Sequence, residues 1–257
     1  MSRLFTRRTL VTAGVMAAGA AGIGAAVPFA GRYGLIPPDH GTIWGAGETL
    51  TYSAQRLLTS GPSLAREFPR SEISKAAVVN GPAPRDEKYR GLLADGFKDW
   101  RLTVDGMVAH PLSFSLEDLK RLPSESHITL HACEEGWSYI AEWIGTPLSE
   151  VLKTCGLLDG ALYVAYFPFD PVDREKSWES IDIHEALHPQ TLVTYGMNDG
   201  DLPVPFGGPL RLRLPRQIGY KSVKFISRVT VTNSLKNLGK GLGSAAPETG
   251  YAWYAGI

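Results

Sequence analysis

A cysteine followed by two acids, at the end of a strand-like run, is the residue of this sequence best suited to chemistry. Residues 128–130 have strand character and lead to Cys133, after which come Glu134, Glu135 and Gly136. Unpaired carboxylates are costly to bury, so a core strand would not continue through these acids. We therefore expect a reachable thiol at a strand tip. Such a thiolate could ligate copper, zinc, iron–sulfur or another thiophilic metal, or act as a nucleophile.

Two other fates of Cys133 remain open from the sequence. A free cysteine is most often a small buried apolar residue, and in an oxidising compartment Cys133 and Cys155 could form a disulfide. Cys155 lies in the expected last turn of a helix that Gly156 ends, which favours a core position. A disulfide would prevent metal binding, and the chain would then be a disulfide-stapled exported binding module.

A third possibility is a metal site made by side chains alone. His131, Cys133 and Glu135 alternate along the chain. If the strand continued, they would share one face and could hold zinc or copper without an organic cofactor. The other histidines lack mutual ligand spacing and are predicted to be structural.

A basic cluster in the last third of the chain could bind an anion. Arg211 and Arg213 alternate with leucines, as they would on one face of a strand. Arg216, Lys221 and Lys224 follow closely. The cluster is either a solvated strand face or a site for phosphate, which guanidinium groups bind in a bidentate way.

Length and charge limit the classes of protein. The 257 residues suffice for one sizeable core, so one domain is the default. With 26 basic and 26 acidic residues the formal net charge is zero, and no global field attracts nucleic acid. The 28 glycines and 18 prolines favour a loop-rich mixed fold over a helical bundle.

The first thirty residues differ from the rest. Arg7 and Arg8 form a twin-arginine pattern, and residues 10–30 contain no charge. Residues 1–30 are therefore predicted to be an export signal or a membrane anchor, which places the protein in the periplasm or on the outer face of the membrane. Twin-arginine export carries folded proteins, which suits an enzyme that takes up a cofactor before export.

The remaining chain divides into two parts. Residues 31–96 are rich in Pro and Gly without sustained periodicity, which predicts an extended arm that wraps around a core formed by residues 97–257. Within that core, Asp105-Gly106 predicts a hairpin turn. Ser115 predicts the capped start of a short helix.

Three stretches, in the same order, resemble the sulfite oxidase-like molybdopterin oxidoreductases, in particular the exported bacterial branch that contains periplasmic methionine sulfoxide reductase catalytic subunits. The resemblance covers about residues 100–233 and implies an α+β fold with a mixed sheet. The stretches are Cys133-Glu134-Glu135-Gly136-Trp137-Ser138 with residues 143–148, residues 188–203, and Gly208-Pro209-Leu210-Arg211-Leu212 with residues 219–224.

The resemblance also implies roles for individual residues. Cys133 would bind the molybdenum of a molybdopterin cofactor, and Glu135 matches an acid that could relay a proton. The further cofactor contacts would be Asn80, Arg211, Ser222, Val223 and Lys224. Phe206 and Pro168 stand where the family has a polar asparagine and threonine, so two contacts are replaced.

Oxygen-atom transfer is the activity that the resemblance implies. Because Glu134 and Glu135 crowd the cysteine, a dianion such as sulfite is disfavoured, and we expect reduction of a neutral S-oxide or N-oxide with electrons from a membrane haem or quinol-linked partner. Sulfite oxidation on the same cofactor is the alternative. It would gain support if Arg101, Arg174 or Arg213 lay over the metal.

Overall fold

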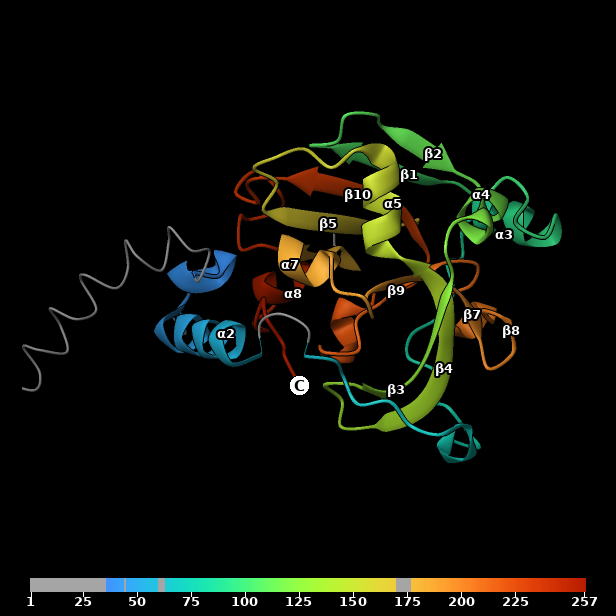
Figure 1. Cartoon of the computed structure of the whole chain (residues 1–257), viewed down its shortest axis with the longest axis horizontal. Coiled ribbons are helices and arrows are strands. Elements are labelled where there is room, and N and C mark those ends of the chain that lie inside the picture. The colour runs from blue at the N-terminus through green and yellow to red at the C-terminus, as the bar shows by residue number, and fades with distance from the viewer. Residues whose placement is uncertain (1–35, 44, 60–62, 170–176) are drawn as a thin grey trace, which may run out of the picture.

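Two five-stranded sheets organise the part of the chain that the computed structural model describes, residues 36–43, 45–59, 63–169 and 177–257 (Figure 1). The first sheet has the strand order β2-β1-β10-β5-β6, and the second has the order β3-β4-β7-β8 with β9 paired to β7. The first sheet is mixed because β1 and β10 run parallel. The predicted α+β class with a mixed sheet is confirmed.

The strands and helices have the following bounds. The strands are β1 (Leu102–Gly106), β2 (Leu112–Phe114), β3 (Glu125–Ala132), β4 (Ser138–Pro147), β5 (Tyr163–Pro168), β6 (Glu179–Asp182), β7 (Leu192–Met197), β8 (Gly200–Asp201), β9 (Arg211–Arg213) and β10 (Ile226–Thr232). The α-helices are α2 (Gly45–Thr59), α3 (Glu87–Ala94), α4 (Leu116–Arg121), α5 (Leu148–Cys155), α7 (Ile183–Ala186) and α8 (Ala245–Glu248). The 3-10 helices are η1 (Pro38–Gly41), η2 (Arg70–Glu72), η3 (Val204–Phe206) and η4 (Gly219–Lys221).

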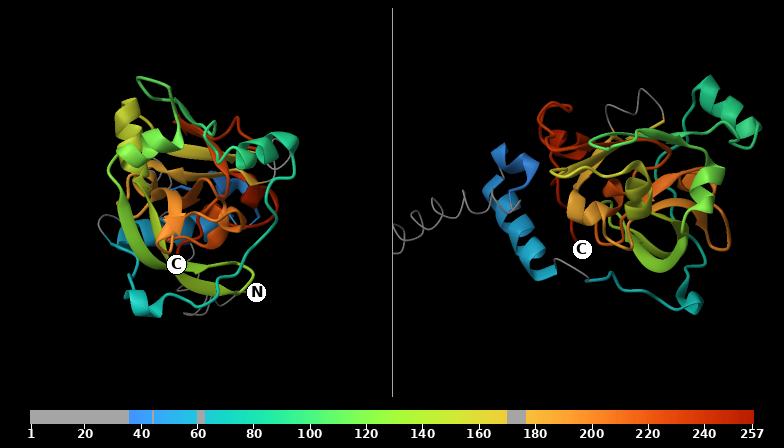
Figure 2. Two further views of the ribbon diagram at one scale, coloured as in Figure 1. Left: turned by 90° about the vertical axis from the view of Figure 1, so that its right-hand side faces the viewer. Right: turned by 45° about the horizontal axis from the view of Figure 1, so that its top comes forward.

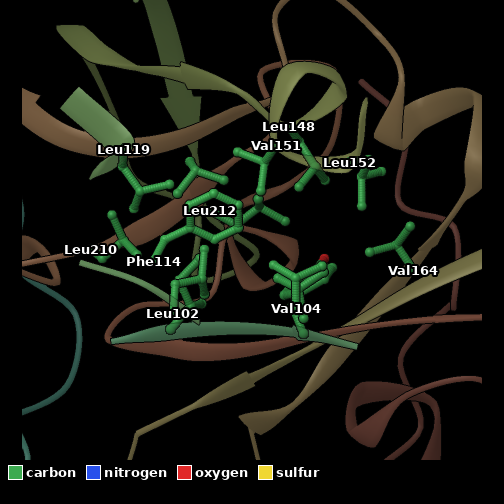
Figure 3. Close-up of a cluster of buried hydrophobic side chains, with 14 of the residues drawn as sticks. Leu102, Val104, Phe114, Leu119, Leu148, Val151, Leu152, Val164, Leu210 and Leu212 are labelled. Carbon is green, nitrogen blue, oxygen red and sulfur yellow. The ribbon is translucent and has the colours of Figure 1, made fainter. Parts of the chain in front are cut away.

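The main hydrophobic core lies between the first sheet and α5. Leu148, Val151 and Leu152 of α5 are fully buried and meet Val104 of β1 and Leu212 of β9 in one cluster (Figure 3). Each buried side chain of this size contributes about 2 kcal/mol of burial free energy. This core fixes the first sheet and β9 relative to each other, and β9 carries the basic residues.

Two local predictions near the core have different outcomes. Ser115 caps α4 with a complete capping box, and Gly156 ends α5 in the left-handed conformation, so both predictions are confirmed. The predicted Asp105-Gly106 hairpin turn is wrong. Gly106 still belongs to β1 and pairs with β10, and β2 begins only at Leu112. The side chain of Asp105 instead accepts hydrogen bonds from Arg228 and Thr230.

The arm before the core is only partly extended. Its middle part runs along the β3–β4 hairpin, where the backbone N–H of Phe68 donates to the carbonyl of Ile128 and that of Ser74 donates to the carbonyl of Ile140 (Figure 2). The prediction of an extended segment is wrong for α2 and α3. In α3, Asp86 provides an N-cap and Tyr89 enters the main core, so this end of the arm is part of the globular unit.

The predicted export segment, residues 1–30, lies outside the described residues. Among the helices that the structure does describe, none is both long and apolar enough to cross a membrane.

Candidate active site

Cys133 lies at the tip of the β3–β4 hairpin. The last pair of the hairpin joins Ala132 to Ser138, so residues 133–137 form its turn. The backbone N–H of Cys133 donates to Trp137 at 2.9 Å, and that of Gly136 donates back to Cys133 at 3.1 Å. Gly136 has φ +90, a conformation that glycine adopts without steric cost. The predicted strand tip is confirmed, although only 9% of Cys133 is exposed.

The thiol of Cys133 is free and has two polar neighbours. Its Sγ donates to Glu134 Oε2 at 3.1 Å, and Asn80 Nδ2 approaches Sγ at 3.8 Å. Burial, and then the adjoining Glu134 carboxylate, raises the pKa of the Cys133 thiol to about 11. Cys155 is also free and fully buried in α5. The disulfide alternative is therefore wrong in this structure.

A pocket of about 440 Å³ opens beside this thiol. Its volume lies within the usual range for small-molecule and cofactor sites. The pocket brings together all six residues predicted to contact the cofactor, which come from the arm, the hairpin tip, β9 and the segment before β10: Asn80, Cys133, Arg211, Ser222, Val223 and Lys224. Phe206 and Pro168, the two replacements of polar family residues, line it as well.

Two cations of the pocket have carbonyl partners and, within the described chain, no carboxylate. Arg211 is 3% exposed and donates to the carbonyl oxygens of Phe206 at 2.8 Å and Ser222 at 2.7 Å. Lys224 Nζ donates to Gly81 at 3.2 Å and Pro205 at 3.1 Å. Burial lowers the pKa of Lys224 to about 8, with the Arg211 charge as a further cause. A bound anion would compensate both charges.

The other basic residues of the predicted cluster do not join this site. Arg213 is 1% exposed, donates to the Leu130 carbonyl at 2.6 Å and lies 5.3 Å from the ring centroid of Trp143. Arg216 pairs with Glu185 at 2.7 Å, and Lys221 pairs with Glu179 at 2.6 Å. The prediction of one anion-binding cluster is therefore wrong for these three residues, which do not line the pocket. They stabilise the interior instead.

The two acids after the cysteine lie differently. Glu134 lines the pocket and contacts Sγ. Glu135 is exposed, and its carboxylate accepts the indole N–H of Trp137 at 2.8 Å. Because strand pairing ends at Ala132, the strand alternation does not continue through the turn, and Glu134 rather than Glu135 is the acid beside the thiol. The predicted proton relay by Glu135 stays a prediction.

Comparison with known proteins identifies the family of this chain. The sequence profile described as "Oxidoreductase molybdopterin binding domain" matches residues 91–237. The chain belongs to the molybdopterin-binding oxidoreductase family. The matched range includes the cysteine turn, β9 and the segment from Ser222 to Lys224, and Asn80 lies before it.

Named relatives in the family extend the match. A protein of Azospira oryzae, named as the protein-methionine-sulfoxide reductase subunit YedZ1, is 35% identical over 193 residues, 75% of this chain and 68% of that protein. The protein-methionine-sulfoxide reductase catalytic subunits MsrP of Xanthomonas axonopodis and Ralstonia nicotianae are 39% and 30% identical, over 51% and 72% of this chain. The chain spans 44% and 64% of the lengths of those two proteins.

A solved structure shows the same fold. The sulfane dehydrogenase SoxCD of Paracoccus pantotrophus matches with a TM-score of 0.50 and 22% identity, over 53% of this chain and 39% of that chain. The sulfite oxidase-like fold implied by the sequence is therefore confirmed.

The residues present fit the cofactor of the family. The buried side-chain nitrogens that have no hydrogen-bond partner within the described chain include His131 Nδ1, Arg211 Nε and Arg213 Nε. Of these, His131 and Arg211 line the pocket. A pterin phosphate would supply the anion that Arg211 and Lys224 lack, and a thiolate is a suitable molybdenum ligand. The molybdopterin cofactor is thus consistent with both the charge and the donor set.

The pterin-free metal site is not assembled. In the described residues, no group of three His, Cys, Asp and Glu side chains lies close enough to hold a metal ion. The turn at Cys133 ends the alternation on which this alternative depended, and Glu135 leaves the shared face.

Sequence reasoning missed several residues of the pocket. His131, two residues before Cys133 on β3, was identified from the sequence only as a candidate zinc or copper ligand, not as part of a cofactor pocket. Tyr139, across the hairpin, gave a weak signal. Tyr220 lies in the resembling stretch 219–224 but was given no role there, and Tyr251 gave no signal, because only the folded chain brings the C-terminal tail to the pocket.

Proposed function

We propose that this protein catalyses oxygen-atom transfer in the direction of reduction, removing oxygen from a neutral S-oxide or N-oxide at a molybdenum held by Cys133. The family supports the cofactor. The relatives named as protein-methionine-sulfoxide reductase subunits support an S-oxide substrate.

The observation that supports this direction most strongly is the position of Glu134. Its Oε2 lies 3.1 Å from Cys133 Sγ, so any substrate that reaches the thiol side of the pocket passes a carboxylate. At a separation of about 4 Å and an effective dielectric of about 20, one such contact opposes an anionic charge by about 4 kcal/mol. A neutral oxide meets no such repulsion, whereas sulfite does.

The arginines that would favour sulfite lie elsewhere, as far as the structure describes them. Arg213 donates a hydrogen bond to the carbonyl oxygen of Leu130. Arg101 donates hydrogen bonds to the carbonyl oxygens of Lys98 and Trp100. Neither lines the pocket. Arg174 lies outside the described residues.

The side chains of the pocket would have separate roles in holding the cofactor and supplying protons. Cys133 would hold the molybdenum, and Arg211, Lys224 and the Ser222–Val223 segment would hold the pterin. When bound, the cofactor supplies two-electron oxygen-atom chemistry. The net reaction consumes two electrons and two protons, so that R₂SO becomes R₂S and water. Glu134, beside the thiol, and Glu135, at the exposed end of the turn, are the acids from which the protons would come.

The electrons must come from a partner. We propose a membrane haem or quinol-linked protein, since the relatives are named as subunits. Export by the twin-arginine route, with the protein periplasmic or anchored on the outer face of the membrane, is part of the same proposal. It is supported by Arg7, Arg8 and the uncharged residues 10–30.

Two assays test the proposal. Protein from a host that makes the pterin cofactor should contain molybdenum and pterin in near-equal amounts, and should reduce methionine sulfoxide faster than it oxidises sulfite. Efficient sulfite oxidation would reverse the assigned direction.

A matched cysteine pair tests the ligand. Cys133→Ser should abolish activity and lower the molybdenum content, whereas Cys155→Ser, in the core of α5, should keep both. Unchanged molybdenum and turnover in Cys133→Ser would refute the role of Cys133.

A further inference from the structure

The C-terminal tail forms one wall of the pocket. Ala246, Thr249 and Tyr251 line the pocket although they follow the last strand of the sheet. The tail is anchored on both sides of Tyr251. Before it, the N–H of Ala246 donates to Glu179 Oε1 at 3.1 Å. After it, Trp253 is 2% exposed. The wall is therefore a fixed part of the structure.

Trp253 fixes this wall through several contacts. Its backbone N–H donates to Asp39 Oδ2 at 2.7 Å, and its indole N–H donates to Ser180 Oγ at 2.8 Å. Its ring centroid lies 5.4 Å from Lys221 Nζ. These contacts determine where the preceding tail residues lie.

Tyr251 differs from its buried neighbours because 49% of it is exposed. Its ring packs against Tyr220, with ring centroids 5.4 Å apart, and the Tyr220 hydroxyl donates to the Ala252 carbonyl at 2.6 Å. The hydroxyl of Tyr251 has no hydrogen-bond partner within the described chain. A large ring with a free donor is thus held at the wall of a pocket, an arrangement common in ligand sites.

The wall that carries Tyr251 begins next to the cysteine turn. Gly219 packs so closely on β3 that an added Cβ would lie 3.1 Å from the Ala132 carbonyl oxygen and 3.1 Å from His131 Nε2. Ala132 directly precedes Cys133, and Tyr220 directly follows Gly219. The chain of contacts therefore runs from Ala132, the residue before Cys133, through Gly219 and Tyr220 to Tyr251.

We propose that Tyr251 binds the substrate and makes the enzyme favour oxides with a large apolar substituent. The ring packs against that substituent, and the hydroxyl donates a hydrogen bond to a polar group of the substrate. Val78, 42% exposed on the arm, lines the same pocket and adds apolar surface. This inference rests on the proposed function and specifies its substrate class.

Steady-state kinetics of the cofactor-loaded enzyme test the inference with two sulfoxides of different size. In Tyr251→Ala, the KM for methyl p-tolyl sulfoxide should rise about tenfold, the scale of one aromatic contact, while that for dimethyl sulfoxide should change by about twofold or less. The value of kcat should be retained for both. Tyr251→Phe should keep most of the affinity for the aryl substrate because it keeps the ring. Leu162→Ala, at a residue 48% exposed and away from the pocket, is the matched control.

A binding measurement separates affinity from turnover. Without an electron donor, calorimetry should give a dissociation constant for methyl p-tolyl sulfoxide that rises in Tyr251→Ala by the same factor as KM. Unchanged KM and binding in an active variant would overturn the inference and leave the proposed function standing. Loss of molybdenum in step with activity would also overturn it, because Tyr251 would then be structural. If the wild-type enzyme reduces neither sulfoxide, the proposed function fails, and the inference fails with it.

Discussion

Replacing Lys221 by methionine should be one of the most destabilising single changes near the pocket. The side chains of Lys221 and Glu179 are 0% and 4% exposed, and their charged atoms lie 2.6 Å apart. Burial lowers the pKa of Lys221, which reflects the cost of keeping this charge away from water. With Lys221 gone, Glu179 keeps only the N–H of Ala246 and becomes an uncompensated buried carboxylate. Breaking one side of such a pair costs about 3–5 kcal/mol.

Urea denaturation at neutral pH measures this cost. In a chain of this size, the loss corresponds to a fall in Tm of about 10 °C. The double variant Lys221→Met/Glu179→Gln should recover much of the stability, because the amide is neutral and still accepts from Ala246. Lys120→Met removes an exposed pair with Asp201, 45% and 88% exposed, and should cost less than about 1 kcal/mol. A loss in Lys221→Met no larger than that of Lys120→Met would refute the reasoning, since the pair would then not be shielded from water.

Two further predictions concern pH and backbone geometry. Burial, and then the Arg216 charge, lowers the pKa of His188 to about 4, so the unfolded chain binds the proton first and stability should fall by about 3 kcal/mol as the pH drops from about 6.5 to 4. His188→Asn should flatten this part of the stability curve relative to the exposed His184→Asn, and equal slopes in urea titrations would contradict the assignment. Gly106→Ala should cost more than about 3 kcal/mol, because φ is +87 and the new Cβ would lie 2.1 Å from the Val231 carbonyl oxygen. Gly160→Ala, at φ +82 with its nearest contact at 3.9 Å, should cost only about 1–2 kcal/mol in the same assay.

Local signals predicted the position of the cysteine well. The change from strand residues to acids and Gly136 marks a turn whatever the rest of the chain does, and Cys133 lies at that turn. The capping residues of α4 and α5 are equally local, and they too were predicted from a few neighbouring residues.

The basic cluster shows that local sequence patterns do not predict which distant elements cover a strand face. Alternation correctly placed Arg211 and Arg213 on one face of β9, but it could not show that the β3–β4 hairpin covers that face. Burial there depends on Leu130 and Trp143, which lie more than sixty positions away in the sequence. The position of Lys221, in η4, depends in the same way on its ion pair with Glu179 of β6.

Helix α2 was missed for a different reason. It contains Gly45 and Gly47 and has few buried positions, so its sequence lacks the apolar periodicity on which helix prediction depends. The wall formed by Tyr251 was missed because it is a product of tertiary folding alone.

The central place of β10 has a consequence for synthesis of the protein. This strand pairs on one side with β1 and on the other with β5, yet it is the last strand to leave the ribosome. Until residue 232 has emerged, the β1–β2 and β5–β6 hairpins stay separate, each with an unpaired edge that can recruit foreign strands. A nascent chain that stalls before this point is therefore vulnerable to aggregation, and completion of translation is what unites the two halves of the sheet.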